Sequence, residues 1–437
     1  MTPPAHRATT AHLGAAYPFV SSPDAGRWGV LIGRDLLGGP FAYDPFELYQ
    51  RGVLTNPNMV VIGQIGRGKS SFVKSYLWRQ SLLGRQAWVV DPKGEYARLA
   101  RAWGVEPILL RPGGPVRLNP LDLGSGGDGP DPVDLLATLV EASSGRHLGP
   151  RERAAVELAL ASVAGSGSAL AGRATAPAGR VTVPVGRVTV PAVVAALLEP
   201  TEDSARAIHT DARTLEEDGR DVALELRRLV HGDLRGMFDG PTSGGVDLAA
   251  PLVVLDLSAV YGSPALGILM TCAMAWLGAR LAARDGQRRL LVIDEAWAVL
   301  ANLGVARWLQ ASWKLSRAYG VANMAVIHHL SDLAASGDNG SAAVKLAQGL
   351  LADSETVVAY AQPPAEVERS AELLGLSSVE AGILPQLGRG VALWRVGRQS
   401  FLVEHHLSRL ERFLVDTDAD MVGGAAGPAA PGSGGRR

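Results

Sequence analysis

Residues 59–71 read MVVIGQIGRGKSS, an apolar run that ends in glycines, a lysine and two serines. Positions 63–70 match the pattern G-x-x-x-x-G-K-[ST] throughout, and a helical segment, SSFVKSYLWRQSLL, follows directly. A phosphate-binding loop requires this context, with a strand before the glycines and a helix after them. The stretch therefore predicts an α/β fold that binds a nucleotide.

The residue types in this loop suit phosphate binding. Glycines let backbone N–H groups wrap around phosphates, and the start of the helix adds the positive end of its dipole. We expect Lys69 to reach the β- and γ-phosphates of ATP and Ser70 to ligate Mg²⁺. The predicted nucleotide-binding residues are Gly63, Gln64, Ile65, Gly66, Arg67, Gly68, Lys69, Ser70 and Ser71.

A second element supplies acidic groups. The run RRLLVIDEAW at 288–297 places Asp294 and Glu295 at the end of an apolar strand, where ligands bind in open α/β sheets. We expect Asp294 to orient Mg²⁺ through water and Glu295 to be the general base that activates the attacking water. The alternative is a strand end with two solvated carboxylates, but pairing with the phosphate loop favours catalysis.

The run WVVDPKGEY at 88–96 is a third candidate element. It follows the helix after the phosphate loop, so we expect its strand to lie beside the loop strand or one strand away. Asp91 and Glu95 would then add carboxylates near the site. Taken alone, a strand followed by a turn explains these residues equally well.

Short β-branched runs alternate with helical stretches, which predicts a mostly parallel sheet flanked by helices. The predicted strands are 60–62, 88–91, 253–257, 291–294, 325–328 and 357–360. Two hairpins are also expected, with strands at 391–397 and 400–406, at an edge of the sheet, and at 29–35 and 40–45. The predicted fold class is therefore α/β, with a C-terminal β-hairpin.

The chain divides into a core, an insertion and two flexible ends. The predicted segments are a flexible N-terminal extension at 1–27, an ATPase core at 28–123 and 246–414, a mostly helical insertion at 124–245 and a disordered Gly/Ala/Pro-rich tail at 422–437. Within the insertion, GRATAP (172–177) and two copies of GRVTVP (179–184 and 186–191) recur every seven residues. Glycine and proline in each copy favour a surface loop or short hairpin over a helix.

Composition excludes several classes of protein. The 437 residues are 47% hydrophobic with a net charge of −1, which is typical of a globular chain without a global basic field for nucleic acid. A single cysteine, Cys272, excludes an internal disulfide and suits a reducing cytoplasm. Gly262, Ser263 and Pro264 interrupt the apolar segment 257–279, leaving roughly 15 apolar residues where a membrane span needs about 20. We therefore expect neither a span nor a signal peptide.

Several motifs in this order resemble one family of motors. They are DPKGEY (91–96), LNPLD (118–122), IDEAW (293–297), VIHHLSDL (326–333), GDLRGMFDGPTS (232–243), LLGLSSVEAGIL (373–384) and GRGVALWRVG (388–397). Together they resemble the conjugative type IV secretion ATPases of the TraC/VirB-four family, in the FtsK/HerA branch of RecA-like motors. The resemblance covers about 28 to 414. It implies a RecA-like core, homo-hexameric rings, membrane components of a secretion channel as partners, and a cytoplasmic place at the inner face of the plasma membrane.

The chain departs from the family pattern at two points. The family carries Gln-Ser in the late motif, where the glutamine senses the γ-phosphate, whereas this chain has His328 and His329. A neutral imidazole can donate one hydrogen bond, so His328 either replaces the glutamine or is simply a polar strand end. Family members also carry an additional N-terminal domain. Only about 27 residues precede Trp28, so we expect a minimal motor.

The transition state of phosphoryl transfer needs a further cation. An arginine supplied by a neighbouring subunit is worth about 10³–10⁵ in rate. The resemblance implies such a residue near the end of the helix at 308–320, where Arg317 matches best, and Arg389 is the second candidate. The alternative is that Arg317 only complements the dipole of its helix.

Two other functions compete with ATP-driven secretion. A DNA-translocating motor, either a coupling protein or a HerA-like pump, is the first; coupling proteins usually carry N-terminal membrane spans, and no dense basic loop suits a DNA pore. A non-hydrolysing scaffold of a secretion complex is the second, and the intact Lys69, Asp294 and Glu295 argue against it. Direct binding of DNA stays open.

Overall fold

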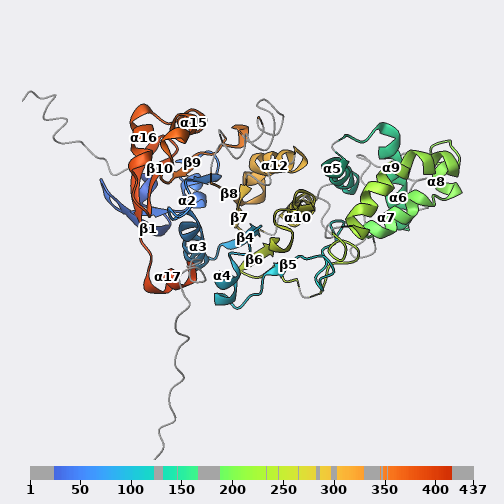
Figure 1. Cartoon of the computed structure of the whole chain (residues 1–437), viewed down its shortest axis with the longest axis horizontal. Helices are drawn as coiled ribbons and strands as arrows, with labels where there is room; N and C mark the ends of the chain where they lie inside the picture. The colour runs from blue at the N-terminus through green and yellow to red at the C-terminus, as the bar shows by residue number, and fades with distance from the viewer. Residues whose placement is uncertain are drawn as a thin grey trace, which may run out of the picture.

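The computed structural model of the protein describes residues 24–122, 131–144, 146–165, 188–232, 234–244, 246–263, 265–281, 286–296, 303–328, 345, 348–351 and 353–415 (Figure 1). Its strands are β1 (Val30–Asp35), β2 (Gly39–Tyr43), β3 (Met59–Ile62), β4 (Gln86–Asp91), β5 (Ile108–Leu109), β6 (Leu252–Asp256), β7 (Arg289–Ile293), β8 (Val321–Ile327), β9 (Thr356–Ala359), β10 (Val391–Val396) and β11 (Gln399–His405). Its helices are α2 (Pro45–Gln50), α3 (Lys69–Gln80), α4 (Ala97–Ala102), α5 (Pro132–Ser144), α6 (Pro150–Val163), α7 (Val190–Leu198), α8 (Glu202–Arg206), α9 (Ala212–His231), α10 (Ala265–Leu281), α12 (Leu303–Tyr319), α15 (Pro364–Leu374), α16 (Ser378–Ile383) and α17 (Arg409–Val415).

All the strands belong to one sheet, in the order β2-β1-β11-β10-β9-β3-β8-β7-β4-β6-β5. From β9 to β5 every neighbouring pair is parallel, and from β2 to β9 every pair is antiparallel. Every strand predicted from the sequence is present, so the mostly parallel α/β sheet is confirmed. The described helices are too short or too polar to cross a membrane.

The two faces of the sheet carry different helices because successive strand residues point to opposite sides. In β3, Val60 and Ile62 pack in the core that includes α10 and α12, whereas Met59 and Val61 pack in the core that includes α3 and α4. Figure 1 shows α10 and α12 on one side and α3, α4 and α17 on the other. The central parallel strands are buried on both faces, which explains their continuous apolar runs.

Two predictions about strand neighbours are wrong. The C-terminal hairpin, β10 and β11, was expected at an edge, but β10 pairs with β9 through Trp394 and Val358, and β11 pairs with β1 through His405 and Gly33. The β1–β2 hairpin therefore forms the edge. The strand of WVVDPKGEY, β4, was expected within one strand of β3, but β8 and β7 lie between them.

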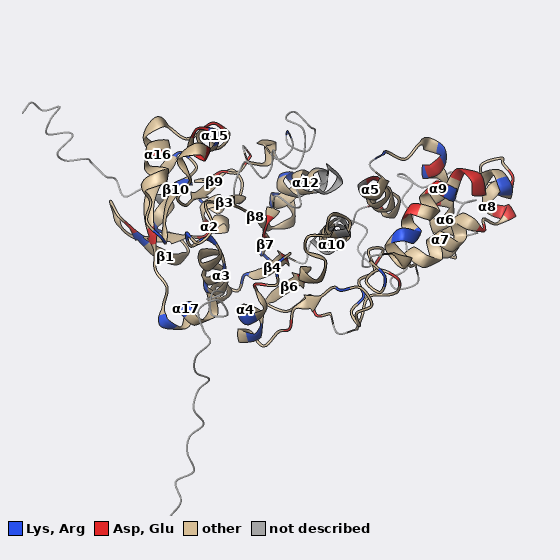
Figure 2. Cartoon of the chain, in the orientation of Figure 1, with Lys and Arg blue, Asp and Glu red and all other residues tan. Residues whose placement is uncertain are grey.

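Five helices, α5 to α9, lie between β5 and β6 in the chain, and α6 to α9 form a group at one end of the molecule (Figure 1). The longest, α9, buries an apolar stripe against the others and carries charges of both signs outside (Figure 2). Its outer face includes the pair Arg220–Glu216 at 2.5 Å. A mostly helical segment was expected here; its predicted limits, 124 and 245, lie outside the described residues.

The end of the last repeat unit, GRVTVP at 186–191, differs from the expected loop. Thr189 accepts a hydrogen bond from the backbone N–H of Ala192 at 3.4 Å, and Val190 and Pro191 form the first turn of α7. Proline is compatible with this position because the first helical N–H groups lack partners. The other two copies, the tail at 422–437 and residues 1–23 lie outside the described residues; 24–26 form a short 3₁₀ turn.

Candidate nucleotide-binding site

The loop GQIGRGK connects β3 to α3, and its shape depends on glycine. Gly63, Gly66 and Gly68 have φ angles of +151°, +78° and +115°, which other residues rarely adopt. At Gly63 a Cβ atom would lie 2.5 Å from the Cβ of Tyr360, so glycine lets the loop lie against the end of β9. The predicted strand–loop–helix context of the P-loop is therefore present.

Lys69 is the first residue of α3 and is 3% exposed. Its Nζ donates hydrogen bonds to the backbone oxygens of Gly63 and, at 3.1 Å, of Gln64. Burial lowers the pKa of Lys69 to about 8, although the charges of Asp294 and Glu295 oppose this shift. Because a phosphate beside an ammonium group stabilises its charged form, a bound nucleotide would raise the pKa of Lys69 again.

Asp294 and Glu295 follow β7 directly and are 6% and 3% exposed. The backbone N–H of Glu295 donates to Oδ1 of Asp294 at 3.0 Å. Burial, and then the charge of Glu295, raise the pKa of Asp294 above its ordinary value. Glu295 has φ +51°, a left-handed conformation that is uncommon for a residue with a side chain and concentrates at functional sites.

Two side chains contact the carboxylate of Glu295. Oε1 of Glu295 forms an ion pair with Nζ of Lys93 and lies 2.5 Å from Nε2 of His328. The sequence predicted neither contact: it left open whether His328 senses the γ-phosphate or is a polar strand end, and it indicated no role for Lys93. The only signal for Lys93 was its place within DPKGEY. The predicted sensing role of His328 stays a prediction, and His329 lies outside the described residues.

Asp91 shapes the loop after β4 rather than offering a free carboxylate. It accepts hydrogen bonds from backbone N–H groups, including that of Tyr96 at 2.9 Å. Burial raises the pKa of Asp91 to about 6, while the Tyr96 hydrogen bond opposes that shift. Glu95 forms an ion pair with Lys74 of α3 at 3.4 Å. Glu95 thus lies beside the P-loop helix, and both acidic residues are already engaged.

Ser70 and Asp294 suit a magnesium ion. Mg²⁺ prefers oxygen ligands and is usually bound by one or two protein groups together with phosphates and water. Ser70 is the second residue of α3, directly after Lys69, and the carboxylate of Asp294 acts electrostatically on the same lysine. Within the described ranges, no group of three or more His, Cys, Asp or Glu side chains forms a metal site. The residues fit an ion that depends on the nucleotide for its remaining ligands.

The two candidate arginines lie in different places. Arg317, near the end of α12, lines a pocket of about 450 Å³ with Asn58 and Trp313, at the start of β3. The P-loop follows the other end of β3, four residues and about 13 Å away. Arg389 precedes Gly390, whose N–H donates to the backbone oxygen of Arg67 in the P-loop at 2.9 Å. Arg389 is therefore beside its own P-loop, whereas Arg317 lies at the other end of β3.

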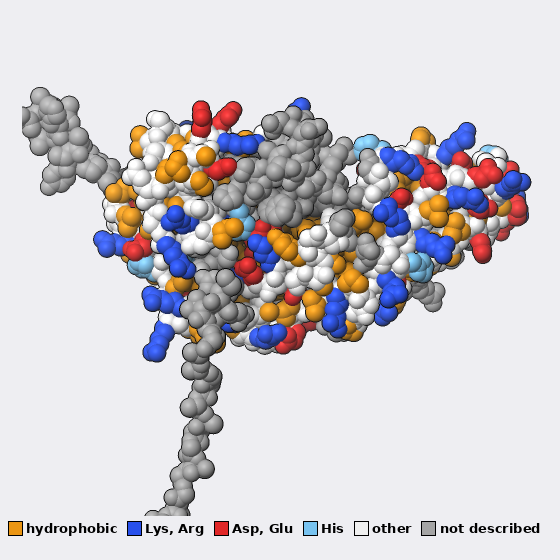
Figure 3. Space-filling view, viewed as in Figure 1, with side chains coloured by type: hydrophobic (Ala, Val, Ile, Leu, Met, Phe, Trp, Pro, Cys, Tyr) orange, Lys and Arg blue, Asp and Glu red, His pale blue; other side chains and the backbone are white. Residues whose placement is uncertain are grey.

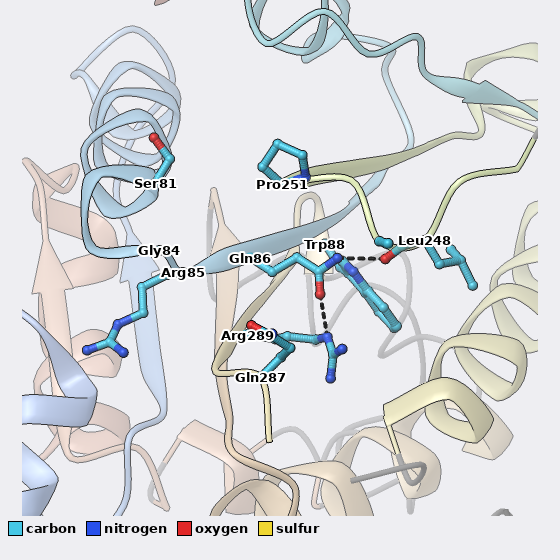
Figure 4. Close-up of a pocket in the computed structure, with 10 residues that line it drawn as sticks. Ser81, Gly84, Arg85, Gln86, Trp88, Leu248, Pro251, Gln287 and Arg289 are labelled. Carbon is cyan, nitrogen blue, oxygen red and sulfur yellow. Dashed lines mark hydrogen bonds between the residues drawn. The ribbon is translucent and has the colours of Figure 1, made fainter. Parts of the chain in front are cut away.

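A second pocket, of about 570 Å³, lies at the starts of β4 and β7 (Figure 4). Within it, Gln86 donates to the backbone oxygens of Leu248 at 2.6 Å and Ala250 at 2.8 Å. Nε of Arg289 donates to Oε1 of Gln86 at 2.5 Å. These polar groups hydrogen-bond to one another. The pocket lies at the amino ends of the strands, whereas the P-loop follows the carboxyl end of β3, so this pocket is not the nucleotide site.

The structure is similar to solved structures of VirB4 and of the coupling protein TrwB. VirB4 of Thermoanaerobacter pseudethanolicus matches with a TM-score of 0.69 and 22% identity, over 88% of this chain and 98% of that chain. The bacterial conjugative coupling protein TrwB, in an unbound form, matches with a TM-score of 0.52 and 16% identity, over 88% and 90%. TrwB in complex with ADP and Mg²⁺ matches with a TM-score of 0.51 and 16% identity, over 88% and 91%.

No protein-family model and no curated protein matches the sequence. At these low identities the structural likeness establishes the fold. The chain has the RecA-like P-loop fold of VirB4 and TrwB, as the resemblance in sequence implied.

Proposed function

We propose that this protein hydrolyses ATP with Mg²⁺ at the P-loop and powers a type IV secretion or conjugation channel. The observation that carries the proposal is that Lys69, Asp294 and Glu295, which come from distant segments of the chain, interact electrostatically. The carboxylates of Asp294 and Glu295 lie close enough to Lys69 to oppose the fall in its pKa. A phosphate-binding lysine beside a buried acidic pair is the arrangement that phosphoryl transfer to water requires.

Each residue has a distinct task in this reaction. Lys69 and the backbone N–H groups of the loop would hold the β- and γ-phosphates, and Ser70 and Asp294 would hold Mg²⁺. Magnesium, when bound, neutralises charge on the phosphate oxygens. Glu295 accepts a proton from water as the water oxygen bonds to the γ-phosphorus and the bond to the β-phosphate oxygen of ADP breaks. Buried surroundings strengthen each of these electrostatic contacts.

Two substitutions separate binding from chemistry. Glu295→Gln should lower kcat about 10²–10⁴-fold without weakening ATP binding, because the amide cannot accept the proton and the phosphate loop is intact. Lys69→Ala should weaken nucleotide binding itself. The rates come from phosphate release and the affinities from calorimetry. If Glu295→Gln hydrolyses ATP at the parental rate, Glu295 is not the base.

The biological role follows from the fold likeness and the resemblance in sequence. The likeness to VirB4, with a TM-score of 0.69, exceeds that to the coupling protein TrwB, at 0.52, which favours a secretion motor over a DNA pump. On the face in Figure 3, Lys and Arg side chains alternate with Asp and Glu and form no continuous basic stripe. The proposed assembly is a homo-hexameric ring at the cytoplasmic side of the membrane, in contact with membrane components of the channel.

ATPase assays with and without duplex DNA distinguish the roles. A secretion motor should hydrolyse ATP at the same rate in both. Strong stimulation by DNA would instead indicate a DNA-translocating motor, and a nucleotide-binding chain with no hydrolysis would indicate a scaffold. Light scattering with ATP and Mg²⁺ measures the expected hexamer.

A further inference from the structure

The loop that follows β4 is held in one conformation by the carboxylate of Asp91. That carboxylate accepts hydrogen bonds from the backbone N–H groups of Lys93 at 3.2 Å, Gly94 at 2.9 Å and Tyr96 at 2.9 Å. Gly94 has φ +74°, and a Cβ there would lie 3.2 Å from Oγ of Ser258, so glycine lets the loop pass close to the end of β6. The side chain of Lys93 therefore extends from a fixed backbone.

This loop directs opposite charges to two different elements. Lys93 forms an ion pair with Glu295, at the end of β7. Glu95 forms an ion pair with Lys74 of α3, which is fully buried with its Nζ 5.2 Å from the centre of the Tyr96 ring. The loop thus connects the P-loop helix to the acidic strand end through two ion pairs.

The first ion pair engages the proposed general base. Lys93 and His328 both contact Oε1 of Glu295, whose side chain is 4% exposed. In the nucleotide-free protein Oε1 of Glu295 is therefore held in an ion pair with Lys93.

Lys93 also lies within electrostatic reach of the phosphate-binding lysine. The charges that act on Lys69 are those of Asp294, Glu295, Lys93 and Glu95. Burial lowers the pKa of Lys93, but the hydrogen bond and the charge of Glu295 outweigh it and raise the pKa above its ordinary value. Lys69 and Lys93, whose side chain is 31% exposed, thus both interact electrostatically with the acidic residues.

We propose that Lys93 exchanges partners during the ATP cycle. It pairs with Glu295 in the nucleotide-free protein and with the γ-phosphate when ATP binds, and this exchange releases Glu295 from the ion pair while His328 stays in contact with it. The inference rests on the proposed ATPase function. A γ-phosphate offers several charged oxygens, so it competes with a carboxylate for the ammonium group. Since ADP lacks this phosphate, Lys93 returns to Glu295 after hydrolysis.

The quantity that tests the exchange is the preference for ATP over ADP. Calorimetry on the full chain with Mg²⁺ gives dissociation constants for ADP and for a non-hydrolysable ATP analogue. Lys93→Met keeps the unbranched stem without the charge, and we expect it to weaken the analogue about ten- to hundredfold, as for loss of one charge-assisted hydrogen bond. Affinity for ADP should change less than about twofold.

Three further variants complete the design. Lys93→Arg keeps the charge and should keep most of the preference for the analogue. Arg101→Met is the matched control, because it removes a cation from α4 that is 63% exposed and far less buried than the site. Glu295→Gln breaks the ion pair from the other side, so it should tighten the analogue relative to ADP, and Lys93→Met in that background should abolish the gain.

The possible outcomes are distinct. A folded Lys93→Met with an unchanged preference, or with equal weakening of both nucleotides, would overturn the exchange and leave the ATPase function standing. A parent protein that binds neither nucleotide would overturn the proposed function and this inference together.

Discussion

Nε2 of His328 lies 2.5 Å from Oε1 of Glu295, so the residue after β8 contacts the carboxylate that follows β7. These two strands are neighbours in the sheet, with Ile293 opposite Ala325. The contact fixes the orientation of the Glu295 side chain, and it comes from the end of β8, the strand between β7 and the P-loop strand β3. It gives His328 a positioning role that does not require contact with the γ-phosphate.

Replacing His328 should therefore affect turnover more than nucleotide binding. His328→Ala removes a hydrogen bond to a charged group, which is worth about 1.5–3 kcal/mol, so kcat should fall about ten- to hundredfold. His328→Gln, whose amide can donate the same bond, should preserve most of the rate. Steady-state kinetics together with calorimetry measure both effects. Equal rates in the parent and both variants would remove His328 from the mechanism.

Arg317 is predicted to complete the site of an adjacent subunit, because it lies near the start of β3, whereas its own P-loop follows the end of that strand. Arg317→Ala should lower kcat by about 10³–10⁵ without loss of ATP binding. Lys69→Ala should be inactive for a different reason. Mixed rings of the two variants should regain activity, since some interfaces would join an intact P-loop to an intact arginine.

The mixing experiment has its own control. Arg389→Ala tests the arginine beside the P-loop of the same subunit, and a cis residue would not complement Lys69→Ala on mixing. Native mass spectrometry verifies that the variants assemble together. Normal hydrolysis by Arg317→Ala, or inactive mixtures despite verified assembly, would reject Arg317.

Removing one partner of the ion pair between Arg79 of α3 and Glu411 of α17 should destabilise the fold strongly. Nη2 of Arg79 lies 2.8 Å from Oε2 of Glu411, and the side chains are 14% and 6% exposed. Nη1 of Arg79 also donates to the backbone oxygen of Ile32 at 3.1 Å. Arg79→Met leaves a buried carboxylate unpaired, so the free energy of unfolding should fall about 3–5 kcal/mol.

Urea denaturation provides the measurement for this pair. The double variant Arg79→Met/Glu411→Leu should lose less stability than Arg79→Met alone, because no buried charge remains unpaired. The exposed pair Arg101–Glu106 is the control, and Arg101→Met should cost at most about 1 kcal/mol. Equal losses in the single and double variants would contradict the assignment.

His405 should make stability depend on pH. Burial, and then the charge of Arg79, lower the pKa of His405 from 6.5 to about 4, with Glu411 opposing and His406 reinforcing the shift. The unfolded chain therefore takes up a proton at higher pH than the folded chain. This contribution to stability is present above about pH 6.5 and is lost as pH falls towards 4.

A variant without a titrating group isolates this effect. His405→Gln keeps a partner for the hydroxyl of Ser75, which lies 2.9 Å from Nε2 of His405. Between pH 6.5 and 4 the parent should lose about 3 kcal/mol more stability than His405→Gln. Parallel curves of unfolding free energy against pH would show that His405 is protonated equally in both states.

Local patterns in the sequence determined the parts of the site that each lie within one segment. The P-loop was predictable because glycines with positive φ, such as Gly66 and Gly68, must stand at fixed places before Lys69. The acidic pair was predictable because an apolar strand that ends in Asp294 and Glu295 places them at the carboxyl end of the strand, where ligands bind in such sheets. The strands were predictable because buried parallel strands are continuously apolar.

Contacts between segments were decided only by the tertiary structure. Lys93 meets Glu295 because β4 pairs with β7, an adjacency that sequence order does not reveal, and because Asp91 holds the loop after β4. Sequence order also does not reveal that β8 and β7 separate β4 from β3, or that the C-terminal hairpin lies inside the sheet. A strand pattern specifies burial and length, whereas the neighbours of each strand depend on how all the helices cover both faces of the sheet.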